Sequence, residues 1–220
     1  MSERLWYVSY GSNLLRERFY TYLTGSDEHS EFGAHPPAPT SSLPAEQRWL
    51  WIDHALYFAG VSRRWTGASA FVSTTVDPTN RSVAHGYLIE RAQFAHLAAV
   101  ENVVAAIDVG ATESLAVGQW SQLEVDREGE SFHGKYDALL RLPDIDGIPA
   151  FTLTSSIVRE PGAPSSRYRS TIRRGLLSAA LDQDVDAYLE AAIERSAKLT
   201  SAHRGSSSAA ARCSPTTEMQ

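Results

Sequence analysis

The N-terminal segment constrains the fold most, because a strand, a tight turn and a helix start follow one another without a spacer. Residues 5–10 are rich in aromatic and β-branched side chains, which favours a β-strand. The tripeptide Gly11-Ser12-Asn13 that follows is typical of a turn. Residues 14–23 are predicted to form a helix, with Ser12 or Asn13 as its N-cap.

This turn is also a candidate anion-binding site. Gly11 permits a positive φ and a close approach of the backbone to a ligand. The N–H groups at a helix start have no partner within the helix, so they favour a carboxylate or an oxyanion. An ordinary capped turn would have the same composition, so the turn alone does not separate the two interpretations.

The later elements do not alternate regularly between strand and helix, which favours an α+β fold over a doubly wound sheet. Residues 24–46 are rich in Gly, Ser and Pro and are expected to form a long inserted surface loop. A single domain is expected over residues 1–200, followed by a disordered tail at 201–220 that lacks a hydrophobic period. Strands are expected at 55–61, 69–76, 83–89, 115–125, 135–142 and 151–156, and helices at 93–107, 168–181 and 185–199.

The composition excludes several classes of protein. Hydrophobic residues make up 43% of the 220, which is enough for a core, and the net charge of −6 gives no electrostatic footprint for nucleic acid. No apolar run is long enough to span a membrane, and the first residues do not resemble a secretory signal, so we expect a cytoplasmic protein, monomeric or homodimeric. The single cysteine, Cys213, allows neither an internal disulfide nor a multi-cysteine metal site.

The predicted helix at 93–107 carries a carboxylate on an apolar face. At about 100° per residue, Glu101 lies between the directions of Phe94 and Leu97, on the side that also holds Val104 and Ala105. A carboxylate among apolar side chains is costly unless it is paired or protonated. A carboxyl group that exchanges its proton near neutral pH suits general acid/base catalysis. A helix-edge glutamate that reaches water, or a structural ion pair, would explain the pattern equally well.

Four sequence blocks follow one another in a known order. The first is Tyr10-Gly11-Ser12-Asn13-Leu14, and the second is an aromatic-Gly strand followed by Trp and small residues, at 57–70. The third is Gly86-Tyr87-Leu88 with the helix segment 97–101, which ends in Glu101, and the fourth is Pro-Ser-x-x-Tyr at 164–168. Together they resemble the γ-glutamylcyclotransferase-like family over roughly residues 5–195. The chain departs from the family's pattern at Gly67-Ala68, where a glycine pair is frequent, and at Asn102, where a glycine often follows the catalytic glutamate.

Members of that family cyclise a γ-glutamyl amide: the glutamyl α-amine attacks its own γ-carbonyl, which releases 5-oxoproline and an amine or amino acid. The resemblance implies a small, mixed, partly closed β-barrel with packed helices. It also implies that Glu101 is the catalytic general base and acid. The substrate, a small γ-glutamyl compound, would contact Tyr10, Gly11, Ser12, Asn13, Leu14 and Tyr168. No metal and no organic cofactor is implied.

The sequence also bears on functions other than this lyase or transferase activity. None of the seven histidines forms a zinc-ligand pattern, which disfavours a metal-dependent deacylase, and the first block lacks the second glycine of a serine-hydrolase elbow. The main alternative is a non-catalytic binding or regulatory module of the same fold, although a pure binder has no need of the carboxyl group at 101. The leaving group is left open among amino acids, amines, an isopeptide lysine and a biosynthetic intermediate. Arg63 and Arg64 could meet a substrate carboxylate or lie in a solvated turn.

Overall fold

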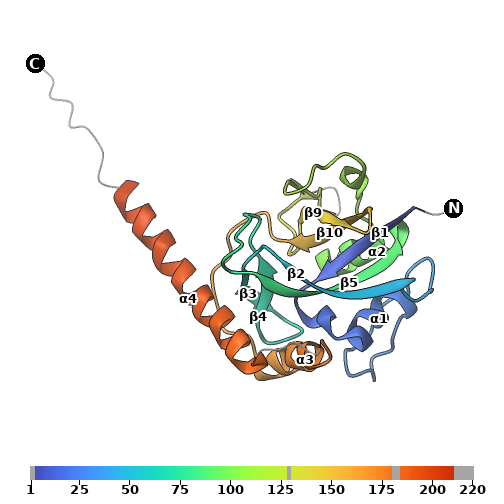
Figure 1. Cartoon of the computed structure of the whole chain (residues 1–220), viewed down its shortest axis with the longest axis horizontal. Helices are drawn as coiled ribbons and strands as arrows, with labels where there is room; N and C mark the ends of the chain where they lie inside the picture. The colour runs from blue at the N-terminus through green and yellow to red at the C-terminus, as the bar shows by residue number, and fades with distance from the viewer. Residues whose placement is uncertain (1–2, 128–129, 180–183, 211–220) are drawn as a thin grey trace, which may run out of the picture.

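A mixed six-stranded sheet forms the centre of the computed structural model, which describes residues 3–127, 130–179 and 184–210 (Figure 1). The first strand, β1, pairs in parallel with β10, and all the other neighbours are antiparallel. Across the sheet the strands are ordered β2 (Glu46–Ile52), β5 (Ser82–Glu90), β1 (Arg4–Ser9), β10 (Ile148–Thr154), β9 (Ala138–Ile145) and β6 (Trp120–Gln122).

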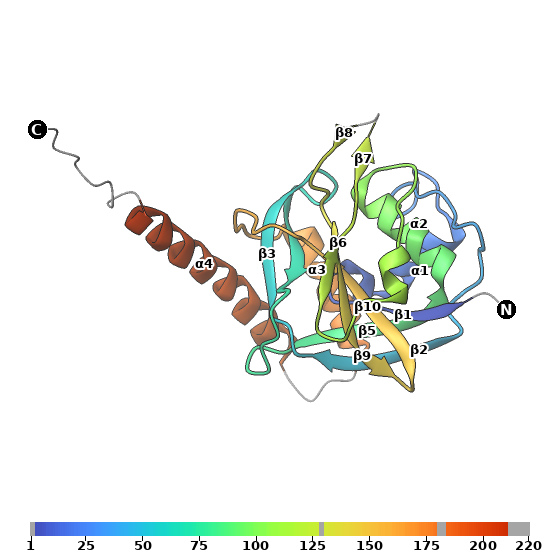
Figure 2. The same ribbon diagram turned by 90° about the horizontal axis from the view of Figure 1, so that it is seen from above.

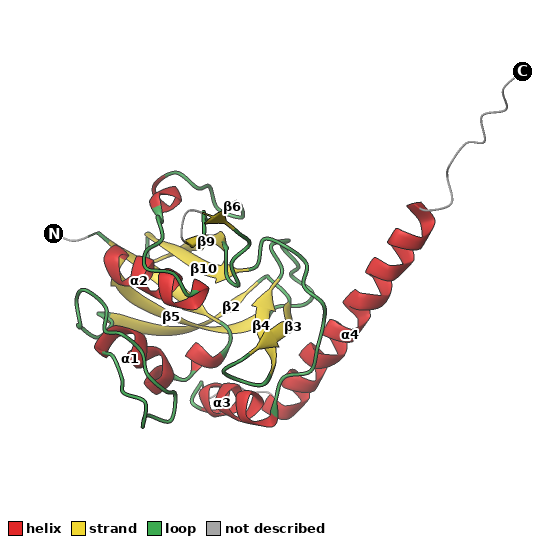
Figure 3. Ribbon diagram, turned by 180° about the vertical axis from the view of Figure 1, so that it is seen from behind, coloured by secondary structure: helices red, strands yellow, loops and turns green. Residues whose placement is uncertain are grey.

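Both faces of the four central strands are buried, because alternate side chains of β5, β1, β10 and β9 enter different cores. In β1, Leu5 and Tyr7 join one hydrophobic cluster, whereas Trp6 and Val8 join the other. The helices α1 (Arg16–Thr24) and α2 (Arg91–Asn102) cover the first face. The other face is covered by the β3–β4 hairpin (Leu56–Ser62 and Gly67–Val72), α3 (Ser166–Leu177) and α4 (Val185–Ala210), as Figure 3 shows.

Smaller elements complete the chain. Short 3₁₀ turns, η1 (Ser12–Leu14) and η2 (Gly110–Glu113), follow β1 and α2, and the β7–β8 hairpin (Asp126–Arg127 and Glu130–Ser131) projects beyond the sheet (Figure 2). The inserted loop after α1 is closed on itself by a backbone bridge between Ser26 and His35. Among the described residues, no helix is long and apolar enough to cross a membrane.

The α+β class is as expected, but backbone pairing does not close the expected barrel in the described part of the chain. In the described chain, β3 and β4 form a separate two-stranded sheet, and one further bridge joins Ala59 of β3 to Pro161. A side chain joins the two sheets instead: the Thr154 hydroxyl accepts from the Val72 N–H at 3.2 Å and donates to the Val72 carbonyl at 2.6 Å. This side-chain bridge takes the place of backbone hydrogen bonds between strands where the barrel would otherwise close.

Several sequence-based boundaries were wrong. The strand β2 was missed because its first residues are polar and half its side chains face solvent, so it lacks a clear hydrophobic period. The helix at 93–107 ends at Asn102, since Val103 takes a left-handed conformation (φ 58°). The helix α4 continues to Ala210 and projects away from the body (Figure 1), so the part of the expected tail that the structure describes, residues 201–210, is helical. The second half of that predicted tail lies outside the described residues.

The helix α3 lies unusually close to the turn after β1. Gly175 of α3 is buried, and a Cβ at that position would lie 2.7 Å from the carbonyl carbon of Leu14 and from the Leu15 nitrogen. Real Cβ atoms do not approach backbone so closely, so only glycine allows this contact. The position of η1 therefore depends on residue 175 being a glycine, which has no side chain.

We expect Gly175→Ala to lower the free energy of unfolding by about 1–3 kcal/mol, because the overpacked contact with backbone outweighs the better helix propensity of alanine. Urea denaturation would measure the change. Gly110→Ala is the matched control, since its Cβ would meet only the side chain of Asp108. An alanine at 175 that leaves the protein equally or more stable would contradict this packing.

Candidate active site

Two adjoining cavities share one wall at the end of α2. The inner cavity has a volume of about 30 Å³, which is room for roughly two water-sized groups. The outer cavity is far larger, about 480 Å³. Four residues line both cavities, namely Ser12, Glu101, Tyr136 and Tyr168.

The structure brings most of the predicted site residues together at the inner cavity. The wall is formed by Tyr10, Gly11, Ser12 and Asn13 from the turn after β1, with Glu101 from α2 and Tyr168 from α3. Leu14 is the exception: it is fully buried in the core beneath α3 and lines neither of these cavities. The turn therefore supplies four candidate contacts instead of the five that the motif suggested.

Gly11 does not have the positive φ that was considered from the sequence. Its φ of −114° lies outside the left-handed region, so a positive φ does not explain the glycine. A Cβ at Gly11 would instead lie 3.1 Å from the Tyr168 hydroxyl and 3.3 Å from the Cβ of Ala70. The absent side chain thus lets α3 and β4 close on the turn and bring Tyr168 to the cavity.

The turn also offers fewer N–H groups than a helix N-terminus would. Residues 12–14 form a 3₁₀ turn, and α1 begins only at Arg16 with Leu15 as N-cap, so the prediction of a Ser12 or Asn13 cap was wrong. The Leu14 N–H donates to the Gly11 carbonyl at 3.0 Å, which removes it from the expected anion cradle. Asn13 compensates in part: its side chain is buried and its Oδ1 has no hydrogen-bond partner, while its Nδ2 donates to the Tyr7 hydroxyl at 3.2 Å.

Tyrosine hydroxyls surround the inner cavity. The Tyr10 hydroxyl donates to the Leu153 carbonyl at 2.6 Å and is committed to the fold. The Tyr168 hydroxyl accepts from the Ala70 N–H at 3.2 Å, which leaves its own hydrogen for a ligand. Burial raises the pKa of Tyr168 to about 12 and raises the pKa values of Tyr7 and Tyr136 as well. These phenols therefore remain protonated near neutral pH and act as donors.

Glu101 is half-buried on the last turn of α2, between the two cavities. Phe94 and Leu97, on the same helix face, are fully buried, so the apolar stripe ends where the cavity begins. The Tyr22 hydroxyl donates a hydrogen bond to Glu101 Oε1, and Arg18 in turn donates to the Tyr22 oxygen at 2.7 Å. No ion pair among the described residues includes Glu101, so the structural ion pair considered from the sequence is not present.

A neutral histidine, His35, contacts Arg18 at the far end of the hydrogen bonds that link Arg18, Tyr22 and Glu101. His35 Nε2 is 2.9 Å from Arg18 Nη1 and 2.8 Å from Arg64 Nη1, and both guanidinium groups can only donate. Its Nδ1 lies 3.1 Å from the Gly33 carbonyl, which fixes the proton on Nδ1. Burial, followed by the charges of Arg18 and Arg64, lowers the pKa of His35 to about 4. The inserted loop thus positions two arginines at the outer cavity without adding a charge.

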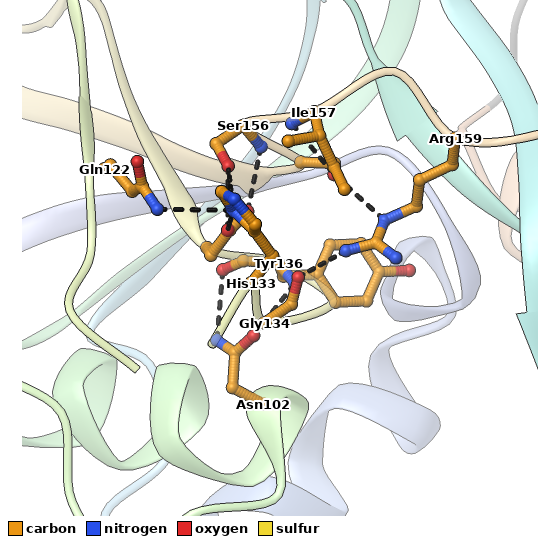
Figure 4. Close-up of polar contacts among 10 residues, drawn as sticks. Asn102, Gln122, His133, Gly134, Tyr136, Ser156, Ile157 and Arg159 are labelled. Carbon is orange, nitrogen blue, oxygen red and sulfur yellow. Dashed lines mark hydrogen bonds and ion pairs between the residues drawn. The ribbon is translucent and has the colours of Figure 1, made fainter. Parts of the chain in front are cut away.

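The loop at residues 132–137 closes the opposite side and is clamped to the end of α2 (Figure 4). The Asn102 side chain pairs with both backbone groups of Tyr136: Nδ2 donates to the carbonyl at 3.0 Å, and Oδ1 accepts from the N–H at 2.9 Å. A Cβ at Gly134 would collide with the Asn102 amide, so the loop needs a glycine there. The clamp holds Lys135 and Tyr136 beside Glu101, which immediately precedes Asn102.

A second group of contacts fixes the same loop to the chain after β10. Asp137 is fully buried, and its carboxylate accepts from the Ser156 N–H at 2.8 Å and from the Ser156 hydroxyl at 2.7 Å. His133 Nδ1 lies 3.3 Å from the same carboxylate, and Arg159 donates to the Gly134 carbonyl (Figure 4). The loop is therefore held at both ends of its short length.

Several cavity residues escaped the sequence analysis. Arg18 and Tyr22 lie four residues apart on the buried face of α1, and a buried arginine at helical spacing was the signal that could have drawn attention to them. Lys135 and Tyr136 fell in a predicted strand, and no local pattern marks them as a loop. In the described ranges, no group of three or more His, Cys, Asp or Glu side chains is placed to hold a metal ion.

Comparison with known proteins gives similar structures and no sequence match. No family model matches the chain, and a search of curated proteins finds none that matches. A solved structure named "Gamma-glutamyl cyclotransferase" is similar at 16% identity with a TM-score of 0.47, over 86% of each chain.

Two further solved structures are similar at the same level. The uncharacterized protein loc79017 from Homo sapiens has 16% identity and a TM-score of 0.45, over 99% of this chain and 92% of that one. YkqA from Bacillus subtilis has 15% identity and a TM-score of 0.45, over 86% of this chain and 54% of that one.

The buried histidine makes stability depend on pH. Because the pKa of His35 is about 4 in the folded chain and about 6.5 in an unfolded one, the unfolded state takes up its proton first as the pH falls. This contribution to stability is therefore complete above about pH 6.5 and is lost towards pH 4. Melting temperatures between pH 7 and 4.5 should fall less steeply for His35→Gln, whose amide oxygen can still accept from the arginines. His29→Gln, in an exposed part of the same loop, serves as control, and equal slopes for His35→Gln and wild type would contradict the assignment.

Proposed function

We propose that this chain is a γ-glutamylcyclotransferase, which cyclises a γ-glutamyl amide to 5-oxoproline and releases an amine or an amino acid. The observation that carries the proposal is the position of Glu101. Its carboxyl group lies between a small inner cavity and a large outer one, with no cation paired to it among the described residues. A group in that position can reach a bond that spans the two cavities.

The reaction requires protons to move from one nitrogen to another. The α-ammonium of the substrate loses two protons as it becomes the lactam N–H, and the departing nitrogen gains two as it becomes an ammonium ion. Glu101 accepts each proton from the attacking nitrogen and delivers it to the departing one, as the new C–N bond forms and the amide bond breaks. The nucleophile is tethered to the electrophile, so the protein's main task is to hold the ring-closing geometry.

The other cavity residues fit supporting roles in this proposal. The inner cavity would take the charged α-end of the glutamyl group, near the Asn13 amide and the backbone of Gly11 and Ser12. The Tyr168 hydroxyl would donate to the γ-carbonyl oxygen as negative charge develops on it. Tyr10 would contribute its ring alone, since its hydroxyl is already bonded to Leu153. Neither a metal nor an organic cofactor has a step in this scheme.

Glu101→Gln tests the proposal, because glutamine keeps the size and the hydrogen bond from Tyr22 but cannot carry a proton. We expect release of 5-oxoproline from a panel of γ-glutamyl amides to fall by about 10²–10⁴-fold, with the melting temperature close to that of wild type. Glu124→Gln, which changes an exposed carboxylate outside both cavities, should keep full activity.

Two results would argue against this function. A folded Glu101→Gln protein that releases 5-oxoproline within about tenfold of the wild-type rate would remove Glu101 from the proton transfers. A wild-type protein that binds γ-glutamyl amides and leaves them intact would instead favour the non-catalytic binding module.

A further inference from the structure

The outer cavity is strongly cationic, although the whole chain carries a net charge of −6. Four basic side chains line it, from three separate elements: Arg18 on α1, Arg63 and Arg64 in the β3–β4 turn, and Lys135 in the clamped loop. Glu101 is the only carboxylate in its described wall, and His35 is neutral because its Nε2 accepts from two arginines. The described wall therefore has a surplus of positive charge that the protein does not neutralise.

The cations of the outer cavity have no carboxylate partner in the described ion pairs. Elsewhere in the described chain, eight arginines pair with carboxylates, as Arg173 does with Asp186, and four others whose side chains are described do not. No described ion pair involves Arg18, Arg63, Arg64 or Lys135. Their concentration around one open cavity is thus a local feature of the site.

Arg18 gives the strongest evidence that the outer cavity binds an anion. It is only 2% exposed, and its Nε has no hydrogen-bond partner, although its other nitrogens donate to Tyr22 and Thr21. A guanidinium group buried without a counter-charge is costly, and an anion in the cavity would offset that cost. Glu101 does not suffice, because its single charge balances only one of the four cations.

We propose that the departing half of the substrate carries at least two negative charges, as an acidic amino acid, an acidic peptide or a phosphorylated amine does. This inference rests on the proposed function and names its substrate class. The glutamyl half is the same in every γ-glutamyl amide and includes an ammonium group beside its carboxylate, so it gives little net charge for the cations to recognise. A departing amino acid supplies one carboxylate, and a second acidic group would use the remaining surplus.

Size and position agree with this assignment. A cavity of about 480 Å³ accommodates an amino acid or a short peptide, whereas the inner cavity does not. Glu101 lies in the wall common to both cavities. A departing group whose nitrogen lies beside Glu101 would therefore extend into the cationic outer cavity. The Asn102 clamp holds Lys135 on this wall, and the contacts between Arg64 and His35 hold the β3–β4 turn against the inserted loop.

The test compares matched substrates that differ only in one charged group. γ-Glutamylglutamate is paired with γ-glutamylglutamine, and γ-glutamylphosphoserine with γ-glutamylserine. At low ionic strength we expect kcat/KM for at least one acidic member to exceed that of its neutral partner by about tenfold or more. The pair that shows the larger ratio identifies a second carboxylate or a phosphate as the recognised group.

Variants then locate the effect. Lys135→Met and Arg63→Met remove charges that make no described hydrogen bond, so the fold should be kept, and each should lower the acidic-to-neutral ratio by about threefold or more. Arg4→Met, an exposed position on β1, should leave the ratio unchanged. Melting temperatures check that each variant is folded.

The failure of this inference differs from the failure of the proposed function. If 5-oxoproline is released equally fast from acidic and neutral partners, the cyclisation stands and the acidic leaving group is wrong. If no amide is cyclised, the same pairs are compared by calorimetric binding to the Glu101→Gln protein. Tighter binding of the acidic members there would support the anion preference alone, and equal binding would overturn it.

Discussion

The paired hydrogen bonds between the Asn102 amide and the backbone of Tyr136 hold the proposed site together. They lie at the last residue of α2, next to Glu101, and attach the loop that supplies Tyr136 to both cavities and Lys135 to the outer one. A buried amide that satisfies an N–H and a C=O at once is costly to remove, because both backbone groups would lose their partner.

The electrostatics of the site follow from the same arrangement. Tyr22 donates to Glu101, Arg18 supports Tyr22, and His35 separates Arg18 from Arg64 without carrying a charge itself. The result is one carboxylate at the inner end of a cationic cavity, within a chain of negative net charge. A cavity of this kind would concentrate anionic ligands from solution and orient their charged end away from the reacting bond.

Residues that follow a local rule could be predicted from the sequence. The strand at 5–10, the turn after it and the position of Glu101 on a helix face all come from spacing along a few residues, and the structure brings Tyr10, Gly11, Ser12, Asn13, Glu101 and Tyr168 to one cavity. The reason for Gly11 was not local: it lies in the approach of Tyr168 and Ala70 from distant elements. The same holds for Arg18, His35 and Lys135, whose roles arise from contacts across three separate segments. The sequence did not predict that α2 ends at Asn102, because Val104 and Ala105 continue the apolar period beyond the helix.

We propose that an internal amine, and not water, attacks the γ-carbonyl carbon. Mass spectrometry of products formed from a γ-glutamyl dipeptide in H₂¹⁸O tests it directly, with an enzyme-free sample to subtract spontaneous cyclisation. We expect 5-oxoproline without ¹⁸O, in equal amount to the released amine. Glutamate that carries one ¹⁸O atom in its γ-carboxyl group would show that water attacks the amide, which would contradict cyclisation.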